Sequence, residues 1–241
     1  MNIHHLSHTL ETQGYYILDN VYSTTEIQQI ATCVEKATQH EEDFLKTKDV
    51  FAIRQLLKNI PKLEGVLFNE NLKSLLSGIY KSPYFLTKAI YFNKPAKSNW
   101  FVPYHQDLSI SVTQKKELKA YINWTYKKGQ YGVQPPLDIL KSITTIRIHL
   151  DDTNLHNGAL KVIPTSHTKG IIRTDQKNWD TDTEKICDVK KGGVMFMKPL
   201  TLHASSRTTN GKQRRVIHLE FSHQKLETPL EWLEYHRLNS I

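Results

Sequence analysis

The segment from Tyr104 to Asp107 carries two side chains that could bind one metal ion, His105 and Asp107. Successive side chains of an extended strand point to opposite faces, so residues two apart share a face. An imidazole and a carboxylate can therefore reach the same ion from this segment. A metal held by two side chains needs a further protein ligand, and the best candidate is His203, far downstream in the chain.

Two histidines and one carboxylate on one side of an ion form a facial triad, which leaves the opposite side open to other ligands. This ligand set is typical of the Fe(II) sites of non-haem oxygenases. The spacing alone is weak evidence, because the chain has 12 histidines and contains two similar pairs. We interpret His149 and Asp151 as a barrel-wall histidine and a turn aspartate. His218, which precedes Glu220, is interpreted as a core or surface residue.

Arg214 follows His203 with an Asn210-Gly211 pair between them, and Asn-Gly between two β patterns is a strong hairpin signal. We therefore expect Arg214 and His203 to lie on neighbouring strands of one sheet. Arginine presents a planar fork to a carboxylate, so Arg214 could bind the far end of a dicarboxylate that chelates the metal. In the structural alternative it is an exposed arginine at a strand end. Strand alternation lets only one of Arg214 and Arg215 point inward.

The elements that position these residues must form from 241 residues, which is enough for one domain with a sizeable core. We predict a single domain over residues 1–241. Cys33 and Cys187 are far apart and lack a Cys-x-x-Cys partner, so neither a zinc ribbon nor a disulfide scaffold is supported. No apolar run is long enough to span a membrane, and the first residues lack the basic and apolar sections of a signal peptide. We expect a cytoplasmic protein without a membrane partner.

The formal charge of +8 raises the question of a nucleic-acid partner. The basic residues are scattered in pairs, however, and the densest cluster, over 212–215, follows the expected hairpin turn. We predict no nucleic-acid partner. The positive charge favours an anionic small-molecule substrate instead.

The first part of the chain, to about residue 83, is predicted to be mainly helical. The segment over 23–26 has the form of a capping box, and four apolar residues follow at helical spacing, Ile27, Ile30, Ala31 and Val34. A second apolar stripe over 72–79 ends near Pro83, where proline stops a helix. Shorter helical pieces are expected at 54–57 and 66–68, and residues 14–18 have the pattern of a short strand.

From about residue 84 to residue 225 the chain is predicted to form strands, over 85–92, 144–150, 159–164, 194–197 and 215–221. In the segment over 144–150, Ile146 and Ile148 alternate with Arg147 and His149, which indicates a half-buried strand. Asn157-Gly158 marks a turn before the strand over 159–164. Helices first and many strands afterwards predict a mainly β fold with flanking α, an antiparallel barrel or sandwich buttressed by N-terminal helices.

A polar stretch from Thr113 to about Pro136 lies directly after the metal pair. We interpret it as an irregular loop. Long loops inside a compact domain are usually functional or disordered, so we expect a lid or a substrate-binding loop here.

Several of these segments together resemble the phytanoyl-CoA dioxygenase family, whose members are Fe(II)- and 2-oxoglutarate-dependent oxygenases. The resemblance covers roughly residues 10 to 225, and its joint pattern is more specific than any one motif. It is carried by 89–95, Asn99-Trp100, Tyr104-His105-Gln106-Asp107, Gln134-Pro135-Pro136, 147–152, 157–167 and the segment from His203 to Arg214. The implied fold is a double-stranded β-helix, the jelly roll of the cupins. In that family the metal pair precedes the long loop, which favours His105 and Asp107 over the later His149 pair.

The resemblance also implies roles for individual residues. His105, Asp107 and His203 would bind Fe(II), and Arg214 would hold the distal carboxylate of 2-oxoglutarate. The remaining cofactor contacts implied by position are Ser205, Trp124 and Ile90. Arg54 or Lys58 is a further basic candidate that the resemblance leaves open.

The reaction that the resemblance implies consumes dioxygen and 2-oxoglutarate, releases succinate and carbon dioxide, and usually hydroxylates a small-molecule substrate. Related halogenases leave the carboxylate ligand position vacant for chloride, so Asp107 favours hydroxylation. The alternative is a cupin-like metal-binding barrel without oxygenase activity, which would not need Arg214. The primary substrate and the oligomeric state are left open.

Overall fold

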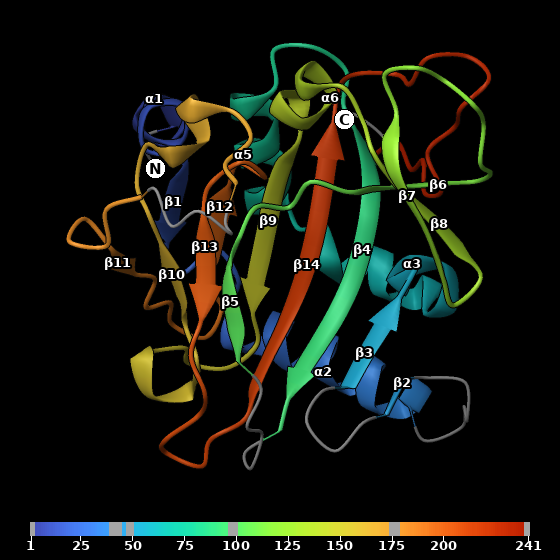
Figure 1. The fold of residues 1–241 in the computed structure, drawn as a ribbon. Coiled ribbons are helices and arrows are strands. Elements are labelled where there is room, and N and C mark those ends of the chain that lie inside the picture. Colours follow the sequence, from blue (N-terminus) through green and yellow to red (C-terminus); the bar gives the residue numbers. More distant parts are fainter. Residues whose placement is uncertain (1–2, 39–44, 47–50, 96–100, 174–178, 239–241) are drawn as a thin grey trace.

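Two antiparallel β-sheets face each other at the centre of the computed structural model (Figure 1). The structure describes residues 3–38, 45–46, 51–95, 101–173 and 179–238. The larger sheet has the strand order β1 (Tyr15–Leu18), β12 (Val194–Met197), β9 (Thr144–His149), β14 (Arg214–Ser222), β4 (Phe85–Lys94), β3 (Phe51–Arg54), β2 (Leu45–Lys46). The smaller sheet has the order β11 (Lys185–Ile186), β10 (Leu160–Val162), β13 (His203–Ser205), β5 (Val102–His105).

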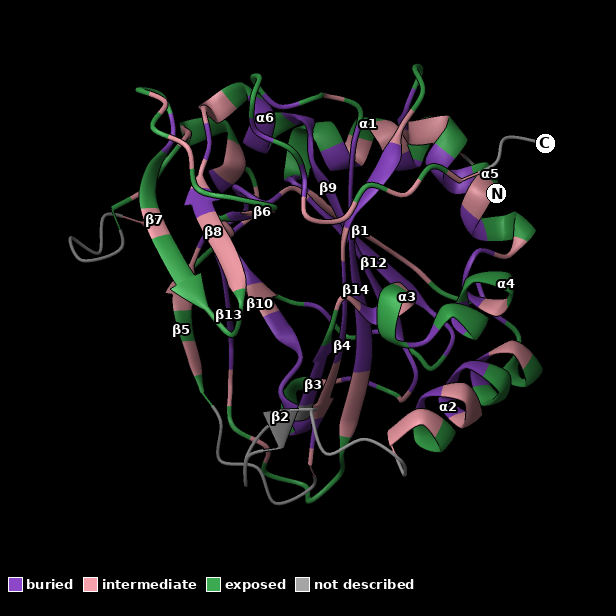
Figure 2. Ribbon diagram, turned by 90° about the vertical axis from the view of Figure 1, so that its right-hand side faces the viewer, coloured by how far each residue is buried: buried purple, intermediate pink, exposed green. Residues whose placement is uncertain are grey.

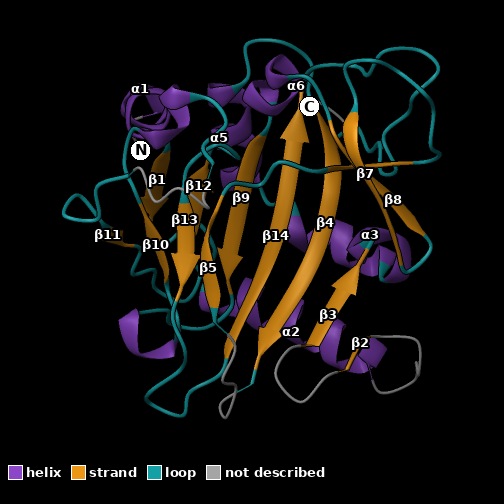
Figure 3. Cartoon of the chain, viewed as in Figure 1, coloured by secondary structure: helices purple, strands orange, loops and turns teal. Residues whose placement is uncertain are grey.

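The chain crosses repeatedly between the two sheets. It passes from β4 in the larger sheet to β5 in the smaller one, and from β9 to β10 and β11, back to β12, across to β13 and back to β14. This winding is the double-stranded β-helix, or jelly roll, and it confirms the predicted fold class. Figure 3 shows the strands in the middle of the molecule and most helices at its periphery.

Helices cover the outer face of the larger sheet. Figure 2 shows α2 (Thr24–Thr38), α4 (Glu64–Leu67) and α5 (Glu70–Ile79) on one side of this sheet and β5, β10 and β13 on the other. One apolar cluster joins Ile30 of α2 and Leu72 of α5 to Ile146, Phe196 and Leu219 of the sheet. Burial of this continuous apolar layer is the main favourable term that holds helices and sheet together.

Helix α2 begins as the sequence predicts. The Glu26 carboxylate accepts the Ser23 backbone N–H at 2.7 Å, and the Ser23 hydroxyl accepts the Glu26 N–H at 3.2 Å, which completes a capping box. The four apolar residues of the predicted stripe in α2 are all buried. The stripe over 72–79 forms α5, which ends at Ile79, before Pro83.

Other N-terminal predictions need correction. Residues 54–57 were expected to be helical, but Arg54 ends β3 and the helix α3 runs over Leu56–Asn59. The helix α1 (Ile3–Gln13) was not predicted. Only Leu6 and Leu10 of this polar segment are buried, and two apolar residues are too few to mark a helical stripe in the sequence. Further along the chain, a short helix α6 runs over Leu137–Ser142, between β8 and β9.

Strand β9 is buried on both faces rather than on one. Ile146 and Ile148 pack against the helices in the apolar cluster, whereas Arg147 and His149 face the space between the two sheets. The pattern looked half-buried because polar side chains occupy the inner face. That inner face is where a jelly roll places its ligands.

The stretch from Thr113 to Pro136 is not an irregular loop. It contains a hairpin of β7 (Ile122–Lys127) and β8 (Gln130–Gln134), which pairs with β6 (Ile110–Val112) in a third sheet. Lys128 and Gly129 both have positive φ, which is typical of a tight hairpin turn. Most of β7 is exposed, so the sequence shows no alternation of apolar and polar residues. Its role as a lid or substrate-binding loop stays a prediction.

Among the described residues, no helix has the length and apolar character needed to cross a membrane.

Candidate metal centre and cosubstrate site

His105 and His203 lie side by side on neighbouring strands. They are paired residues in the antiparallel β5–β13 pair, with ring centroids 4.2 Å apart. Asp107 follows β5, and its backbone N–H donates to Pro199 O at 2.9 Å, next to the segment that leads into β13. One potential ligand atom from each of the three residues lies within 4.8 Å of the others. The structure thus brings His203 to His105 and Asp107, which lie far upstream of it in the chain.

Gln106 explains why its two neighbours share a face. Its side chain points the other way, where the amide nitrogen donates to Leu200 O at 2.7 Å and to Gly170 O at 2.8 Å. The amide oxygen accepts the Ile172 N–H at 2.8 Å. This anchor fixes the backbone between the two ligands, so the imidazole and the carboxylate are held on the opposite face.

The histidines are oriented by backbone carbonyls. The Nδ1 atom of His105 lies 2.9 Å from Pro103 O, and Nδ1 of His203 lies 2.9 Å from Thr201 O. A carbonyl can only accept a hydrogen bond, so each Nδ1 carries the proton and each Nε2 keeps a free lone pair. Each Nε2 is 3.7 Å from an Asp107 carboxylate oxygen, which is too long for a direct hydrogen bond. This donor set fits a divalent metal ion between the three side chains.

The pKa values of the ligands favour the forms that bind metals. Burial lowers the pKa of His203 to about 4, against the opposing effect of Asp107. Burial raises the pKa of Asp107, but the neighbouring His203, His218, His105 and Lys88 outweigh it and hold that pKa below its usual value. A neutral imidazole and an ionised carboxylate are therefore present at neutral pH.

A cavity of about 220 Å³ opens between the sheets at this triad. Its wall includes the triad itself, Ser205 on β13 and Arg214 on β14. Burial and then the nearby Arg147 lower the pKa of Arg214 to about 9, so it is cationic at neutral pH. The three metal-ligand candidates and the guanidinium of Arg214 thus line one cavity.

Arg214 is the inward member of its pair, and Arg215 faces outward. Arg215 forms an ion pair with Asp151 at 2.7 Å and a second one with Glu35 at 3.0 Å. The expected hairpin is wrong, because β13 belongs to the smaller sheet and β14 to the larger one. The segment between them crosses the barrel, so Arg214 and His203 face each other from different sheets.

Gly158 supports Arg214 from the predicted Asn157-Gly158 turn. Its carbonyl accepts a hydrogen bond from the Arg214 guanidinium. Its φ is 81°, and a Cβ at this position would lie only 2.7 Å from Ser206 O and 2.8 Å from Lys94 Nζ. Only glycine fits this close approach without displacing its neighbours.

Comparison with known proteins decides the class of this site. The family model for phytanoyl-CoA dioxygenase matches residues 10–216, which is most of the chain. The chain belongs to the phytanoyl-CoA dioxygenase family. Phytanoyl-CoA dioxygenases use Fe(II) and 2-oxoglutarate, and the activity of this chain is of that oxygenase type. No curated sequence matches the chain significantly.

Solved structures share the fold of this phytanoyl-CoA dioxygenase family member at low identity. The epimerase SnoN from nogalamycin biosynthesis has a TM-score of 0.70 and 13% identity, over 99% of this chain and 93% of that one. The carbocyclase SnoK of the same biosynthesis has a TM-score of 0.66 and 16% identity, over 90% and 83%. HygX from Streptomyces hygroscopicus has a TM-score of 0.65 and 13% identity, over 90% and 86%.

The cofactor contacts expected from the family resemblance are only partly at the cavity. Ser205 and Arg214 are among the residues that line it. Trp124 lies on β7, where its indole N–H donates to Tyr121 O at 3.1 Å, and it packs against a separate apolar cluster. Ile90 is buried on β4 opposite His218. Neither Trp124 nor Ile90 is among the described residues that line the cavity.

Several further residues singled out in the sequence lie outside the cavity lining or outside the described part of this phytanoyl-CoA dioxygenase family member. Asp151 is a turn residue paired with Arg215, and His149 is a buried wall residue whose Nδ1 lies 2.8 Å from the Thr153 hydroxyl. Arg54 is exposed at the end of β3, and neither it nor Lys58 is among the described residues that line the cavity. Asn99-Trp100 lies outside the described residues.

Four polar residues of the cavity wall were missed as site residues from the sequence, Asn93, Lys94, Arg147 and His218. The alternation over 144–150 places Arg147 on the face opposite the isoleucines, and this was the available signal. The prediction that His218 is a core or surface residue is too coarse, because His218 lies on the inner face of β14 four residues after Arg214.

Proposed function

We propose that this enzyme hydroxylates a small organic molecule, with Fe(II) held by His105, Asp107 and His203 and 2-oxoglutarate held by Arg214. The observation that carries the proposal is one cavity with a facial triad and a guanidinium on its wall. When bound there, iron and 2-oxoglutarate would supply the oxidising chemistry of the family, with dioxygen consumed and succinate and carbon dioxide released.

The ligands of the structural relatives support this assignment. HygX has been crystallised with nickel and 2-oxoglutarate, and also with hygromycin B. SnoN has been crystallised with Fe³⁺, α-ketoglutarate and nogalamycin RO. These proteins share the fold of this chain, and we infer that its cavity accepts the same kind of metal and cosubstrate.

The residues of this chain would perform separate tasks. Thr201 O and Pro103 O keep the protons of the two imidazoles on Nδ1, so that both Nε2 atoms stay available. Arg214 offers a bidentate partner to the distal carboxylate of the cosubstrate. Ser205, buried on β13 two residues after His203, can donate its hydroxyl proton to the same molecule. The two sheets hold these groups in place.

Hydroxylation is favoured by the third ligand. In a chloride-transferring relative, the metal position of this carboxylate would be vacant for chloride. Asp107 fills that position here, so the triad leaves no place for a halide ligand. The structural relatives SnoK and SnoN are a carbocyclase and an epimerase, so the same fold supports reactions other than hydroxylation. A product that gains one oxygen atom, measured by mass spectrometry, would separate hydroxylation from those outcomes.

The deciding experiment is an anaerobic titration of the Fe(II)-loaded protein with 2-oxoglutarate. We expect a weak visible charge-transfer band for the wild type, and we expect it to be lost in His203→Ala. Iron binding without any band would contradict the proposal and would leave a metal-binding barrel without this chemistry.

A further inference from the structure

Arg147 is a buried cation in the cavity wall that forms no ion pair with any described carboxylate. It lies on β9, is only 8% exposed, and is one of the residues that line the cavity. Its Nε is buried and makes no hydrogen bond, and no ion pair joins it to a carboxylate within the described parts of the chain. Buried arginines are normally paired, so this guanidinium points to a ligand that the protein itself does not supply.

A chain of hydrogen bonds through His218 and Glu220 fixes the orientation of Arg147. Its Nη1 lies 3.2 Å from Nδ1 of His218, and Nε2 of His218 lies 3.1 Å from Oε1 of Glu220. Arginine can only donate hydrogen bonds, so Nδ1 of His218 is the acceptor. Nε2 of His218 then carries the proton and donates a hydrogen bond to the Glu220 carboxylate. Glu220 is also paired with Lys88 at 2.8 Å. The negative charge of Glu220 is therefore already balanced by Lys88, and the positive charge of Arg147 is not.

The position of Arg147 differs from that of Arg214. Arg147 is paired across the β9–β14 ladder with His218, and these strands lie side by side in Figure 1. His218 is four residues from Arg214 along β14, which separates the two backbone positions by about 13 Å. Arg147 and the metal-ligand candidate Asp107 line the same cavity.

The charges of the cavity leave an excess for a second anion. Arg147, Arg214 and Lys94 all line it, with Asp107 as the only carboxylate among the described lining residues. A divalent metal ion would add to the positive charge. A dianionic cosubstrate held by Arg214 would offset only part of that charge. The remaining positive charge is in the same cavity as the triad, where the substrate must bind to react.

We propose that Arg147 binds an oxyanion group of the primary substrate, so that the substrate is a small organic acid or phosphorylated compound. The inference rests on the proposed function, because it assumes that Arg214 takes the cosubstrate. His218 and Glu220 are positioning residues, which fix the orientation of the Arg147 fork.

The test uses acetate, with acetamide as its neutral counterpart, and inorganic phosphate as probes. Each is added anaerobically to the Fe(II)-loaded protein at saturating 2-oxoglutarate, and the charge-transfer band is followed. We expect acetate or phosphate to shift the band of the wild type, and acetamide to leave it unchanged. In Arg147→Gln the anion should bind about 10-fold more weakly or worse, because a charge-assisted pair is lost. Arg237→Gln removes one exposed positive charge elsewhere and should behave as the wild type.

Several results would overturn the inference. For the wild type, these are no response to either anion or an equal response to acetamide. For Arg147→Gln, they are an undiminished response to the anions or a loss of 2-oxoglutarate binding. The last result would assign Arg147 to the cosubstrate instead. A wild type that binds iron but shows no band would overturn the proposed function and this inference together, and is thereby distinguished from the others.

The stability of the metal-free protein gives a second readout. A buried guanidinium without a carboxylate partner costs stability, whereas its hydrogen bond to His218 adds stability, so Arg147→Met should unfold at about the same temperature as the wild type. A lower unfolding temperature for Arg147→Met would show that Arg147 serves the fold, which contradicts the inference.

Discussion

The geometry of the triad depends on single backbone contacts. Each metal-binding imidazole is fixed by the carbonyl two residues before it, and Gln106 fixes the turn between His105 and Asp107. These contacts need no metal ion to form. The residue types therefore determine the chemistry, and their immediate backbone partners determine the orientation.

Replacing Asp107 should remove the metal site while leaving the fold intact. In Asp107→Ala we expect 2-oxoglutarate-dependent succinate formation to fall by more than about 100-fold, because the loss of a metal ligand exceeds the effect of losing an outer contact. Asp182→Ala, which changes an exposed aspartate, is the control. Full activity of Asp107→Ala would refute its role as a ligand.

Replacing Arg214 should separate cosubstrate binding from metal binding. Arg214→Met should weaken 2-oxoglutarate binding by about 10–100-fold, because a charge-assisted bidentate contact is lost, while iron affinity stays the same. Both constants can be measured by anaerobic titration, with Arg237→Met as a charge-matched control. Unchanged 2-oxoglutarate affinity would assign the distal carboxylate to another residue.

At the scale of elements, the inner face of the larger sheet was the hardest part to predict. The apolar stripes of α2 and α5 are local patterns, so the sequence predicts these helices well. Strand partners are not local. Asn210-Gly211 signalled a hairpin, yet the strands on either side belong to different sheets, because winding a jelly roll depends on contacts between distant segments.

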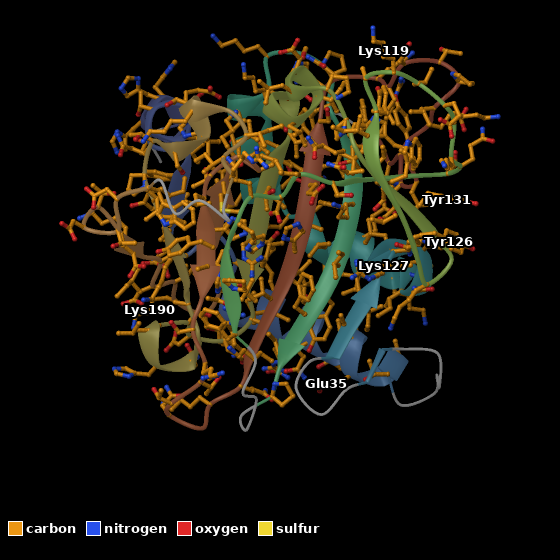
Figure 4. All side chains as sticks on the ribbon, in the orientation of Figure 1. Glu35, Lys119, Tyr126, Lys127, Tyr131 and Lys190 are labelled. Carbon is orange, nitrogen blue, oxygen red and sulfur yellow. The ribbon has the colours of Figure 1, made fainter. Side chains whose placement is uncertain are left out.

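The exposed hairpin of β7 and β8 shows a second reason for failure. Tyr126, labelled in Figure 4, is exposed, and its ring centroid is 4.7 Å from that of the partly buried Tyr131. Val133 of β8 and Trp124 of β7 pack against an apolar cluster, but most of β7 is exposed, so the turn and the cross-strand pairs contribute much of the stability of this hairpin. It therefore carries no hydrophobic periodicity that a reading of the sequence could find.

The C-terminal segment closes the edge of β4 through Glu234. The Glu234 carboxylate accepts the Ala89 N–H at 3.1 Å, and burial raises the pKa of Glu234 from 4.5 to about 7 despite that hydrogen bond and Lys88. The folded protein thus holds a proton that the unfolded chain releases above pH 4.5. The stability contributed by this group is complete below pH 4.5 and is lost as the pH rises through about 7.

We therefore expect Glu234→Gln to stabilise the protein at about pH 8, by about 1–3 kcal/mol, because it keeps the acceptor without the charge. The gain should shrink toward about pH 5, where the wild-type carboxyl is protonated. Urea unfolding at both pH values measures the difference, and Glu231→Gln on the same segment is an exposed control. A gain that does not depend on pH would contradict this explanation.

At the scale of the whole molecule, the site connects the two sheets. The triad comes from β5, the residues after it and β13, whereas Arg214 comes from β14 on the facing sheet. Bound metal and cosubstrate would therefore link both halves of the barrel. A ligand that binds only the folded state stabilises it by mass action.

Saturation with Fe(II) and 2-oxoglutarate should raise the unfolding temperature of the whole chain. At about 100 times the dissociation constant the gain is about 2.7 kcal/mol, which corresponds to roughly 5–10 °C for a protein of this size. Anaerobic calorimetry would detect it. An equal rise in His203→Ala would mean that the ligands act elsewhere.

The site residues that the sequence predicts are those whose spacing or family pattern marks them. His105 and Asp107 were accessible because their spacing matches one strand face, and the joint pattern of the family supplied His203 and Arg214. Arg147 was not recognised as a site residue, because its significance depends on its having no ion pair with a carboxylate of the described residues, and only the folded structure reveals this. The prediction of a single domain over 1–241 stays a prediction.

The carbonyl contacts of the two imidazoles have a consequence for metal choice. Because the ligands are held by their own strands, the site offers the same two nitrogens and one carboxylate to any divalent ion of similar size. Affinity for such sites rises from iron through cobalt and nickel to copper. We expect protein produced where nickel, copper or zinc is abundant to be mismetallated and inactive, so the supply of ions, rather than the sequence, decides whether the chain is a catalyst.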